Sequence, residues 1–480
     1  MENLKYDIKS ATSIINYAKQ LYNKTLREAC ESEINNHNYQ GKGNFGQIVE
    51  KYYFGYEPNS ISEADFPEAG LELKTSPLIE LKNGQIQSKE RLVLNIIDYM
   101  SIHQEEFEES SFWKKNKHLL LIFYLYQKGI NILDLEISLI DDWEFPNEDF
   151  EIIKNDWLLI QQKVREGNAH ELSEGDTFYL GASTKGSTAA KSFRNQPNNE
   201  LQAKQRAFSL KQGYVNYIIM QMAERNKNHS NILQEEFEKY GKKQIKPFKI
   251  KQNPIEKLIQ SKFEGNIGKS IVELLEKYNI KIKDINAKHL YALIVKAILG
   301  VSSDEELEQF KKAEIQVKTI RIKSTNVIEQ SISFPSFKFE KIYNEDWNNS
   351  EFKERIEKKF LFVFFKQIGN EYFLEKYKFW NMPFNDRNEC RKVWLETKKV
   401  IQTGKIISEV KVQKNGKEIR KNNFPNIKDS DVAHVRPHGK NSFDTYPLPV
   451  AEFTTKEKEY TKQGFWLNHD YVLKKIYLDE

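Results

Sequence analysis

Asp65, Glu72 and Lys74 could together bind a divalent cation and act on a phosphate. They stand in the run D-F-P-E-A-G-L-E-L-K, in which Glu72 and Lys74 are two residues apart. Side chains two apart on a strand point to the same face. Two carboxylates can hold Mg²⁺, and the neighbouring ammonium group can favour a metal-bound hydroxide and stabilise negative charge on an attacked phosphate. The run therefore predicts a site for Mg²⁺-dependent phosphodiester hydrolysis, although a surface loop leading into an amphipathic strand explains the same residues.

Two more charged residues are candidates for the same site. Glu50 lies in K-G-N-F-G-Q-I-V-E, which is expected to form a helix before the strand, so it could supply a third carboxylate. Lys117 stands at the entrance of a strongly apolar strand, where a cation can reach a phosphate. The alternatives are a solvated helix acid for Glu50 and a charged residue flanking a hydrophobic strand for Lys117.

A degenerate second copy makes this run informative. The run Q-F-K-K-A-E-I-Q-V-K ends in Lys318 but has Gln309 and Gln316 where the first copy has its acids. Neutral amides cannot offset the cost of dehydrating Mg²⁺ as carboxylates do. A second pattern, F-S-L-x3-Y-V at Phe208–Val215, returns as F-W-L-x3-Y-V at Phe465–Val472. These ordered matches predict a tandem duplication with one active and one inactive copy.

The alternation of predicted helices and strands favours an α/β fold. Strands are expected at 70–75, 91–99, 118–126 and 360–367, and helices near 10–30 and at 44–54, 149–167 and 204–222. This order is typical of a mixed sheet flanked by helices. A chain of 480 residues is expected to form two or three domains. We expect modules over residues 1–225 and 256–480, joined by a polar linker over 226–255.

The composition excludes several other classes of protein. No apolar run reaches the ~20 residues of a membrane span, and the N-terminus lacks the apolar centre of a signal peptide. The two cysteines form no zinc pattern, so a cytoplasmic protein without disulfides is expected. The net charge of +4 is too balanced to prove nucleic-acid binding, but it allows a local basic groove. A Walker A phosphate-binding motif, a nucleophile elbow and an H-E-x-x-H zinc motif are absent from the sequence.

Three short polar segments are suited to contact with DNA. They contain Lys42 and Gly43, then Thr184 and Lys185, and in the second half Arg436, Pro437 and His438. Glycine lets the backbone approach a groove closely, and hydroxyl and basic side chains can donate to phosphates and base edges. Arginine also suits a bidentate contact with guanine. Plain surface turns are the alternative for each segment.

Taken together, these motifs resemble a known family. Residues 41–75, with K-G-N-F-G-Q-I-V-E and D-F-P-E-A-G-L-E-L-K-T, resemble the MutH class of GATC-specific DNA endonucleases. The similarity continues through S-S-F-W-K-K-N-K-H-L-L-L, the Asp156-Trp157 segment and R-A-F-S-L-K. Over its full length the chain resembles type II restriction endonucleases built from two MutH-like modules, in which the second module is catalytically inactive and binds another copy of the recognition site.

The resemblance implies two MutH-like modules that form DNA-binding clefts, and Mg²⁺-dependent cleavage of both DNA strands at 5′-GATC-3′. The cut is expected before the G and leaves four-base 5′ overhangs. The protein is expected to be a monomer when free and to dimerise or loop DNA when two sites are present. The family's residues fall on Asp65, Glu72 and Glu50 as metal-binding acids, Lys74 and Lys117 as active-site lysines, and Lys42, Gly43, Thr184, Lys185, Lys211, Arg436, Pro437 and His438 as DNA-binding residues. The first module has Ser183-Thr184 where the second keeps Arg436-Pro437, so the residues that read guanine in the first module stay open.

Two other functions remain as alternatives. A methylation-directed nicking endonuclease of mismatch repair would use the same catalytic residues, but the nicking relatives have a single module. A non-catalytic DNA-binding regulator would not need the intact Asp65, Glu72 and Lys74.

Overall fold

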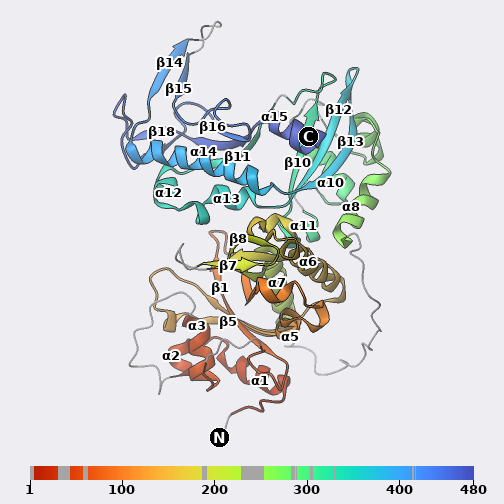
Figure 1. The fold of residues 1–480 in the computed structure, drawn as a ribbon, viewed down its shortest axis with the longest axis vertical. Helices are drawn as coiled ribbons and strands as arrows, with labels where there is room; N and C mark the ends of the chain where they lie inside the picture. Colours follow the sequence, from red (N-terminus) through yellow and green to blue (C-terminus); the bar gives the residue numbers. More distant parts are fainter. Residues whose placement is uncertain are drawn as a thin grey trace. The chain divides into compact units, whose positions relative to one another are not determined.

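The chain divides into two compact units, each with its own hydrophobic core. The computed structural model describes residues 5–30, 44–57, 63–185, 192–228, 253–282, 287, 289–302, 306–328, 330–412, 416 and 418–479. Unit 1 comprises residues 1–258 and 308–314, and unit 2 comprises residues 259–307 and 315–480. Figure 1 shows unit 1 mainly in red to yellow and unit 2 in green to blue. Most of the predicted linker, 229–252, lies outside the described residues.

Unit 1 is built from two main sheets, several short helices and two long helices, α6 and α7. Its helices are α1 (Ala11–Ala18), α2 (Leu26–Ala29), α3 (Asn44–Ile48), α4 (Tyr99–Ile102), α5 (Ser111–Asn116), α6 (Asn147–Arg165), α7 (Gln212–Asn228) and α11 (Glu308–Ala313). Its strands are β1 (Glu72–Glu80), β2 (Ile86–Ser88), β3 (Leu92–Ile96), β4 (His118–Leu125), β5 (Ile137–Glu144), β6 (Leu180–Thr184), β7 (Phe193–Gln196), β8 (Asn199–Lys204) and β9 (Arg206–Leu210). Helix α8 (Pro254–Glu264) begins in unit 1 and ends in unit 2.

The central sheet of unit 1 has the strand order β2-β1-β4-β5. Strands β1 and β4 are parallel, whereas the outer pairs are antiparallel. The five residues from Leu119 to Phe123 in β4 are all 0% exposed. A strand covered on both faces reads as such a continuous apolar run. The predicted strands at 70–75 and 118–126 are therefore confirmed as β1 and β4, and the predicted helix at 149–167 as α6.

A second, antiparallel sheet has the order β3-β9-β6 and corrects one prediction. The sequence predicts a helix over 204–222, but residues 206–210 form β9 and the helix begins only at Gln212. All five residues of β9 are buried, and the strand is paired on both edges, with β3 and with β6. The run 91–99 likewise forms only the short strand β3, and α4 begins at Tyr99. A short buried run carries no periodicity that separates a strand from a helix.

Helix α11 packs on α7 within unit 1 through a buried lysine. Lys312 has a side chain only 3% exposed, and its Nζ lies 3.2 Å from Asp149 Oδ1 and 3.0 Å from Glu308 Oε1. The ammonium group also lies 3.5 Å from the ring centroid of Tyr217. A Cβ added at Gly213 would lie 2.0 Å from the carbonyl oxygen of Lys311, so glycine permits the close approach of the two helices.

Unit 2 repeats six strands of the two main sheets of unit 1, and β2 has no counterpart in the described sheet of β10, β12 and β13. The order β10-β12-β13 matches β1-β4-β5, with β10 parallel to β12 and β12 antiparallel to β13. The order β11-β19-β16 matches β3-β9-β6. Gln316 pairs with Phe360 as Glu72 pairs with Leu119, so the repeated runs open equivalent strands.

Unit 2 places its strands among short helices and one long helix, α14. Its helices are α9 (Ile271–Lys277), α10 (Leu290–Leu299), α12 (Phe339–Asn344), α13 (Glu351–Ile356), α14 (Phe384–Thr403) and α15 (His469–Tyr471). Its strands are β10 (Gln316–Ile322), β11 (Ile332–Phe337), β12 (Phe360–Ile368), β13 (Glu371–Trp380), β14 (Ser408–Val412), β15 (Glu418–Asn422), β16 (Ala433–Pro437), β17 (Thr445–Pro447), β18 (Glu459–Thr461) and β19 (Gln463–Leu467).

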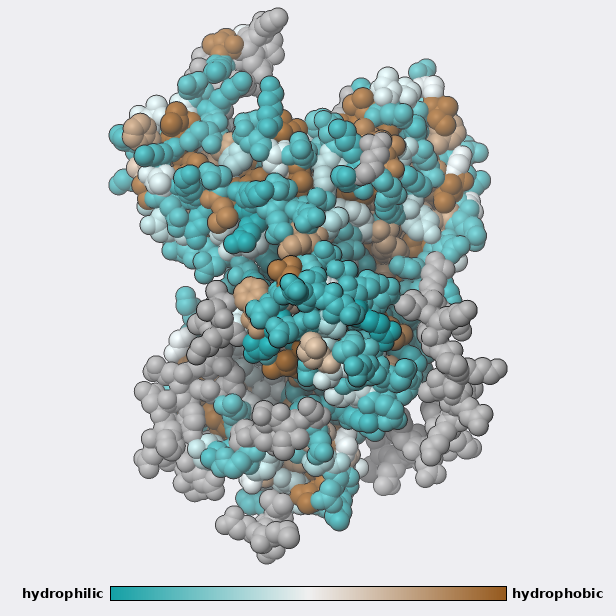
Figure 2. Space-filling model, viewed as in Figure 1, coloured by the Kyte–Doolittle hydropathy of each residue, from teal (hydrophilic) through white to brown (hydrophobic). Residues whose placement is uncertain are grey.

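The visible surface is mainly hydrophilic, with hydrophobic residues scattered over it (Figure 2). Single exposed hydrophobic side chains are normal for a folded protein. Among the described residues, no helix has both the length and the apolar character needed to cross a membrane.

Candidate active site

Strand β1 places Glu72 and Lys74 side by side. Glu72 is 1% exposed, and the Lys74 ammonium group donates a hydrogen bond to its Oε1. The two residues are two apart on the strand, so both side chains leave the same face. Parallel pairing with β4 fixes this end of the strand, since Glu72 and Lys74 lie opposite Leu119 and Leu121.

The loop before β1 folds Asp65 back onto Glu72. The backbone N–H of Asp65 donates to Glu72 Oε2 at 3.0 Å, and the backbone N–H of Leu73 donates to Asp65 Oδ2 at 3.0 Å. Phe66 and Leu71 form a single antiparallel bridge across the loop. Gly70 has a φ of +63°, a conformation that glycine adopts without strain. The seven-residue separation in sequence thus becomes direct contact between the two acid-bearing residues.

Glu50 reaches the same site from the neighbouring helix. Helix α3 continues as a π-helical turn over Val49–Tyr53, and its Phe45 ring stacks on Tyr124 of the sheet at 3.9 Å. A Cβ at Gly46 would lie 3.2 Å from Thr75 Oγ1, so this glycine lets the helix lie close to β1.

The three acids crowd negative charge into a partly desolvated place. Burial and the nearby Asp65 carboxylate raise the pKa of Glu50 to about 7, against the opposing effect of Lys74. Burial raises the pKa of Glu72 to about 6, although Lys74 favours its ionised form. Like charges and desolvation both disfavour ionised carboxylates. A bound cation would relieve this crowding.

Lys115, not Lys117, supplies the second lysine of the cluster. Lys115 Nζ lies 3.5 Å from Glu72 Oε1, and its side chain is 14% exposed. Lys117 is exposed and lines a separate hollow together with Gly70, Trp113 and His118. The sequence predicts Lys117 as the second active-site lysine, whereas the structure has Lys115, two residues earlier, beside Glu72. An α-helix turns about 100° per residue, so side chains two apart on α5 point in nearly opposite directions.

The acidic residues fit Mg²⁺ in donor chemistry, although their side chains are not arranged as metal ligands. Among the described residues, no three acidic, histidine or cysteine side chains surround a common point. Lys74 and Lys115 instead neutralise Glu72, and backbone N–H groups occupy one oxygen of Glu72 and one of Asp65. Carboxylate oxygens are the ligands that Mg²⁺ prefers. The carboxylates here lie close enough together to contribute to the raised pKa of Glu50 and of Glu72.

The predicted DNA-contacting residues of unit 1 have different positions. Thr184 is exposed at the end of β6 and Lys185 follows it, with a pKa lowered by burial and by the charge of nearby Lys74. Lys185 therefore lies toward the acidic cluster. Lys42 and Gly43 lie outside the described residues.

Lys211, predicted to contact DNA, is buried in the structure and its side chain is not exposed for that contact. It is 3% exposed, and its Nζ donates to the carbonyl oxygen of Thr177 at 2.6 Å. The nearby Asp156 carboxylate accepts hydrogen bonds from the backbone N–H groups of Phe178, Tyr179 and Leu180 at the start of β6. Both residues thus hold the segment that leads to Lys185.

The equivalent place in unit 2 lacks the acids. Gln316 is exposed at the start of β10, and Lys318 has a pKa lowered by burial and by Arg355. Val295, which aligns with Glu50 when Gly300 is aligned with Gly55, is 1% exposed within α10. No carboxylate of the first copy has a counterpart at these positions.

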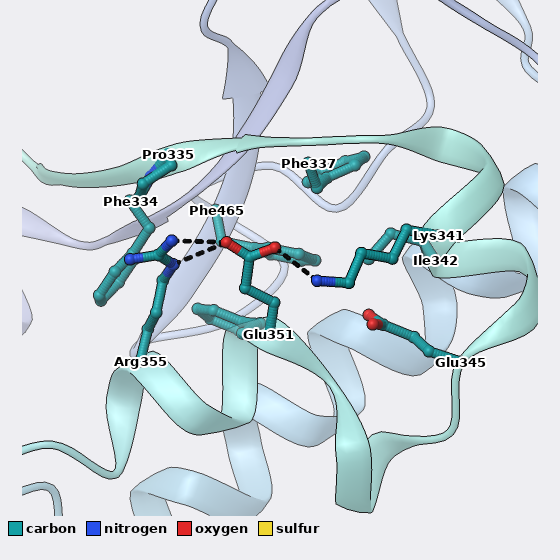
Figure 3. A pocket seen from close by; sticks show the side chains of 10 residues that line it. Phe334, Pro335, Phe337, Lys341, Ile342, Glu345, Glu351, Arg355 and Phe465 are labelled. Atoms are coloured by element: carbon teal, nitrogen blue, oxygen red, sulfur yellow. Dashed lines mark hydrogen bonds and ion pairs between the residues drawn. The ribbon is translucent and has the colours of Figure 1, made fainter. Parts of the chain in front are cut away.

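Arg355 occupies in unit 2 the position that Lys115 has in unit 1, five residues after a helix-capping serine. It lines a small hollow between β11, α12 and α13. Figure 3 shows the Glu351 carboxylate between Arg355 and Lys341, to which it is bonded at 2.5 and 2.9 Å. Arg355, the cation beside Lys318, is thus paired with Glu351 of α13 and not with a residue of β10.

The predicted DNA-contacting residues of unit 2 form an exposed cationic edge. Arg436 and Pro437 are exposed at the end of β16. The Arg436 guanidinium stacks over the Trp466 ring at 4.5 Å from its centroid, and the His438 ring lies 5.4 Å from the same ring. Stacking on an aromatic face holds the guanidinium in place, and its N–H groups can still donate to other acceptors.

Comparison with known proteins identifies the family. The model of the family "DNA mismatch repair enzyme MutH" matches residues 54–156, which include Asp65, Glu72, Lys74 and Lys115. The type II restriction enzyme Sau3AI of Staphylococcus aureus is 36% identical over 97% of this chain and 98% of its own length. The chain therefore belongs to the Sau3AI-like type II restriction enzymes and is a site-specific deoxyribonuclease with a MutH domain.

Proposed function

We propose that the cluster of Glu50, Asp65, Glu72, Lys74 and Lys115 is the catalytic centre, and that it hydrolyses both strands of DNA at 5′-GATC-3′. We place the cut before the G, with four-base 5′ overhangs. One observation carries the assignment. Lys74 of β1, Asp65 of the preceding loop and Lys115 of α5 all contact Glu72, and these four residues lie inside the segment that matches the MutH family. Glu50, just before that segment, lies close enough for Asp65 and Glu72 to raise its pKa.

Each residue has a chemical role that follows from its place. Asp65, Glu72 and Glu50 would hold Mg²⁺. When bound, this ion would act as a Lewis acid and lower the pKa of the water bound to it. With the charge of Glu72 taken up by a bound metal, Lys74 and Lys115 would be free to turn their ammonium groups to the phosphate. There they stabilise the negative charge that develops on the attacked phosphoryl group. Lys185 and Thr184 would contact the DNA backbone beside this centre.

Unit 2 is proposed to bind a second GATC site without cutting it. The two units share the strand order and register, and the second has lost every acid of the first at the aligned positions. It keeps an exposed arginine supported on Trp466, which suits a bidentate contact with guanine. On this view residues 1–225 form the catalytic module and 256–480 the binding module. A free monomer would then dimerise or loop DNA when two sites are present.

Mapping both ends of digested DNA tests the proposed reaction. Methylated and unmethylated DNA of known sequence would be incubated with the protein and Mg²⁺. Linear products with four-base 5′ overhangs at every GATC are expected. Nicked circles would favour the mismatch-repair type of reaction that the MutH match also allows, and cuts at another sequence would reject GATC as the site.

Plasmids with one and with two GATC sites test the role of unit 2. If a second site activates cutting, the two-site plasmid is cut at the higher rate per site. Equal rates would show that unit 2 does not act as an effector-binding module.

A further inference from the structure

An aromatic cluster beside the acids contains one hydroxyl without a partner. The Tyr56 hydroxyl is buried, with less than 1 Å² exposed, and makes no hydrogen bond among the described residues. The hydroxyl groups of the other tyrosines in this cluster, Tyr6, Tyr17 and Tyr53, are all hydrogen-bonded. Tyr6 donates to the carbonyl oxygen of Phe54 at 2.8 Å, and Tyr17 and Tyr53 donate to each other's carbonyl oxygens at 3.3 and 2.7 Å. A buried hydroxyl without a partner costs folding free energy, so a native structure that keeps one calls for an explanation.

Tyr56 is held between the two segments that carry the acids. Its backbone N–H donates to the carbonyl oxygen of Glu50 at 3.1 Å. Its ring packs edge to face on Phe66 at 5.4 Å, and Phe66 directly follows Asp65. Tyr56 is therefore tied to Glu50 through its backbone and to the neighbour of Asp65 through its ring.

The hydroxyl lies within electrostatic reach of the three carboxylates. Burial raises the pKa of Tyr56 above its usual range, and the charges of Asp65, Glu50 and Glu72 raise it further, Asp65 most strongly among them. A tyrosine hydroxyl can donate a hydrogen bond, and a carboxylate oxygen can accept one. Asp65 uses its Oδ2 to accept from Leu73, and its Oδ1 has no partner among the described residues.

We propose that Tyr56 is a positioning residue of this site, whose hydroxyl donates to the Asp65 carboxylate when the acids bind a divalent cation. The inference rests on the proposed function. Tyr56 touches no substrate on this view. It acts through Asp65, because hydrogen-bonded partners of ligating carboxylates fix their orientation and raise the affinity for the metal.

Tyr56→Phe removes the hydroxyl and keeps the ring, and Tyr6→Phe is the matched control from the same cluster. Calorimetric titration of the full-length, DNA-free protein with Ca²⁺ measures the affinity directly. Tyr56→Phe should weaken Ca²⁺ binding by about 10–100-fold, as expected for a partner of a ligating carboxylate. Tyr6→Phe should change it by less than about twofold, because its hydroxyl bonds Phe54 and not an acid.

Stability and cleavage provide two readouts that a purely structural role would not reproduce. Without metal, Tyr56→Phe should be at least as stable as the wild type in urea, since it removes an unsatisfied group, whereas Tyr6→Phe should be less stable. In cleavage assays Tyr56→Phe should raise the Mg²⁺ concentration for half-maximal rate, and excess Mg²⁺ should restore the rate.

The outcomes separate this inference from the proposed function. If Tyr56→Phe binds Ca²⁺ as tightly as the wild type while Glu72→Gln does not bind it, the role of Tyr56 is wrong and the metal site stands. If Glu72→Gln also binds Ca²⁺ normally, the metal site itself is wrong. A loss of metal-free stability in Tyr56→Phe equal to that in Tyr6→Phe would show a structural hydroxyl and overturn the positioning role.

Discussion

The crowding of carboxylates at Glu50 predicts that the acidic site destabilises the metal-free protein above neutral pH. The pKa of Glu50 is raised from 4.5 to about 7 in the folded protein. Below about pH 4.5 both the folded and the unfolded chain carry the proton, so there is no effect on stability. Between about pH 4.5 and about pH 7, Glu50 keeps its proton only in the folded protein. Above about pH 7, Glu50 is ionised in the folded protein as well. Stability therefore falls as pH rises through this window.

The size of the effect follows from the same shift. At about 1.4 kcal/mol per pKa unit, the difference between about 7 and 4.5 corresponds to about 3 kcal/mol. Glu50 is only half-buried, and solvent screening reduces this to about 1–2 kcal/mol. Glu50→Gln carries the neutral side chain at every pH. We expect it to match the wild type at about pH 5 and to be about 1–2 kcal/mol more stable at about pH 8.

Urea denaturation of the metal-free proteins at the two pH values measures the difference. Glu57→Gln is the control, because Glu57 is exposed and paired with Lys51 at 2.6 Å, away from the cluster. It should show no pH-dependent gain. Mg²⁺ should stabilise the wild type more at the higher pH, since it replaces the proton. A Glu50→Gln protein no more stable than the wild type at about pH 8 would refute the crowding of charge.

Three further predictions concern other parts of the chain. Lys115→Ala should lower the cleavage rate at least about 100-fold, whereas Lys117→Ala should stay within about threefold of the wild type. Equal losses in rate assays would contradict their different placements. Lys312→Met should lower the free energy of unfolding in urea by about 3–5 kcal/mol, because the Asp149 charge is left buried without its cationic partner. The double variant with Asp149→Asn should recover most of this loss, and a single-variant loss below about 1 kcal/mol would contradict the burial of the pair. Arg436→Ala should abolish the advantage of a two-site over a one-site plasmid, and an unchanged ratio of rates would exclude this arginine from effector binding.

The strand part of the site could be predicted from the sequence, because it depends on local geometry alone. Alternation along a strand places Glu72 beside Lys74, and the structure shows them in contact. The contact of Asp65 with Glu72 depends on a tight loop, for which the run P-E-A-G was an adequate signal. The apolar run of β4 likewise indicated a buried strand without any tertiary information.

Of the helix part, Glu50 was predicted, but the lysine of α5 was placed at Lys117 and not at Lys115. The choice between Lys115 and Lys117 depends on where α5 ends and on which way each side chain points. A usable signal existed. Both copies have a serine followed two residues later by phenylalanine, and this alignment places Lys115 opposite Arg355. The burial of Lys211 had no local signal, because its partner is a backbone carbonyl at Thr177, distant in sequence.

Cleavage by a Glu72→Ala protein tests the central claim most directly. DNA of known sequence would be digested with Mg²⁺, and binding of a GATC duplex would be measured in parallel. The rate should fall at least about 1,000-fold while the duplex is still bound, because Glu72 is the acid on which the cluster converges. Cutting at GATC at a rate near that of the wild type would contradict the assignment of catalysis to this cluster.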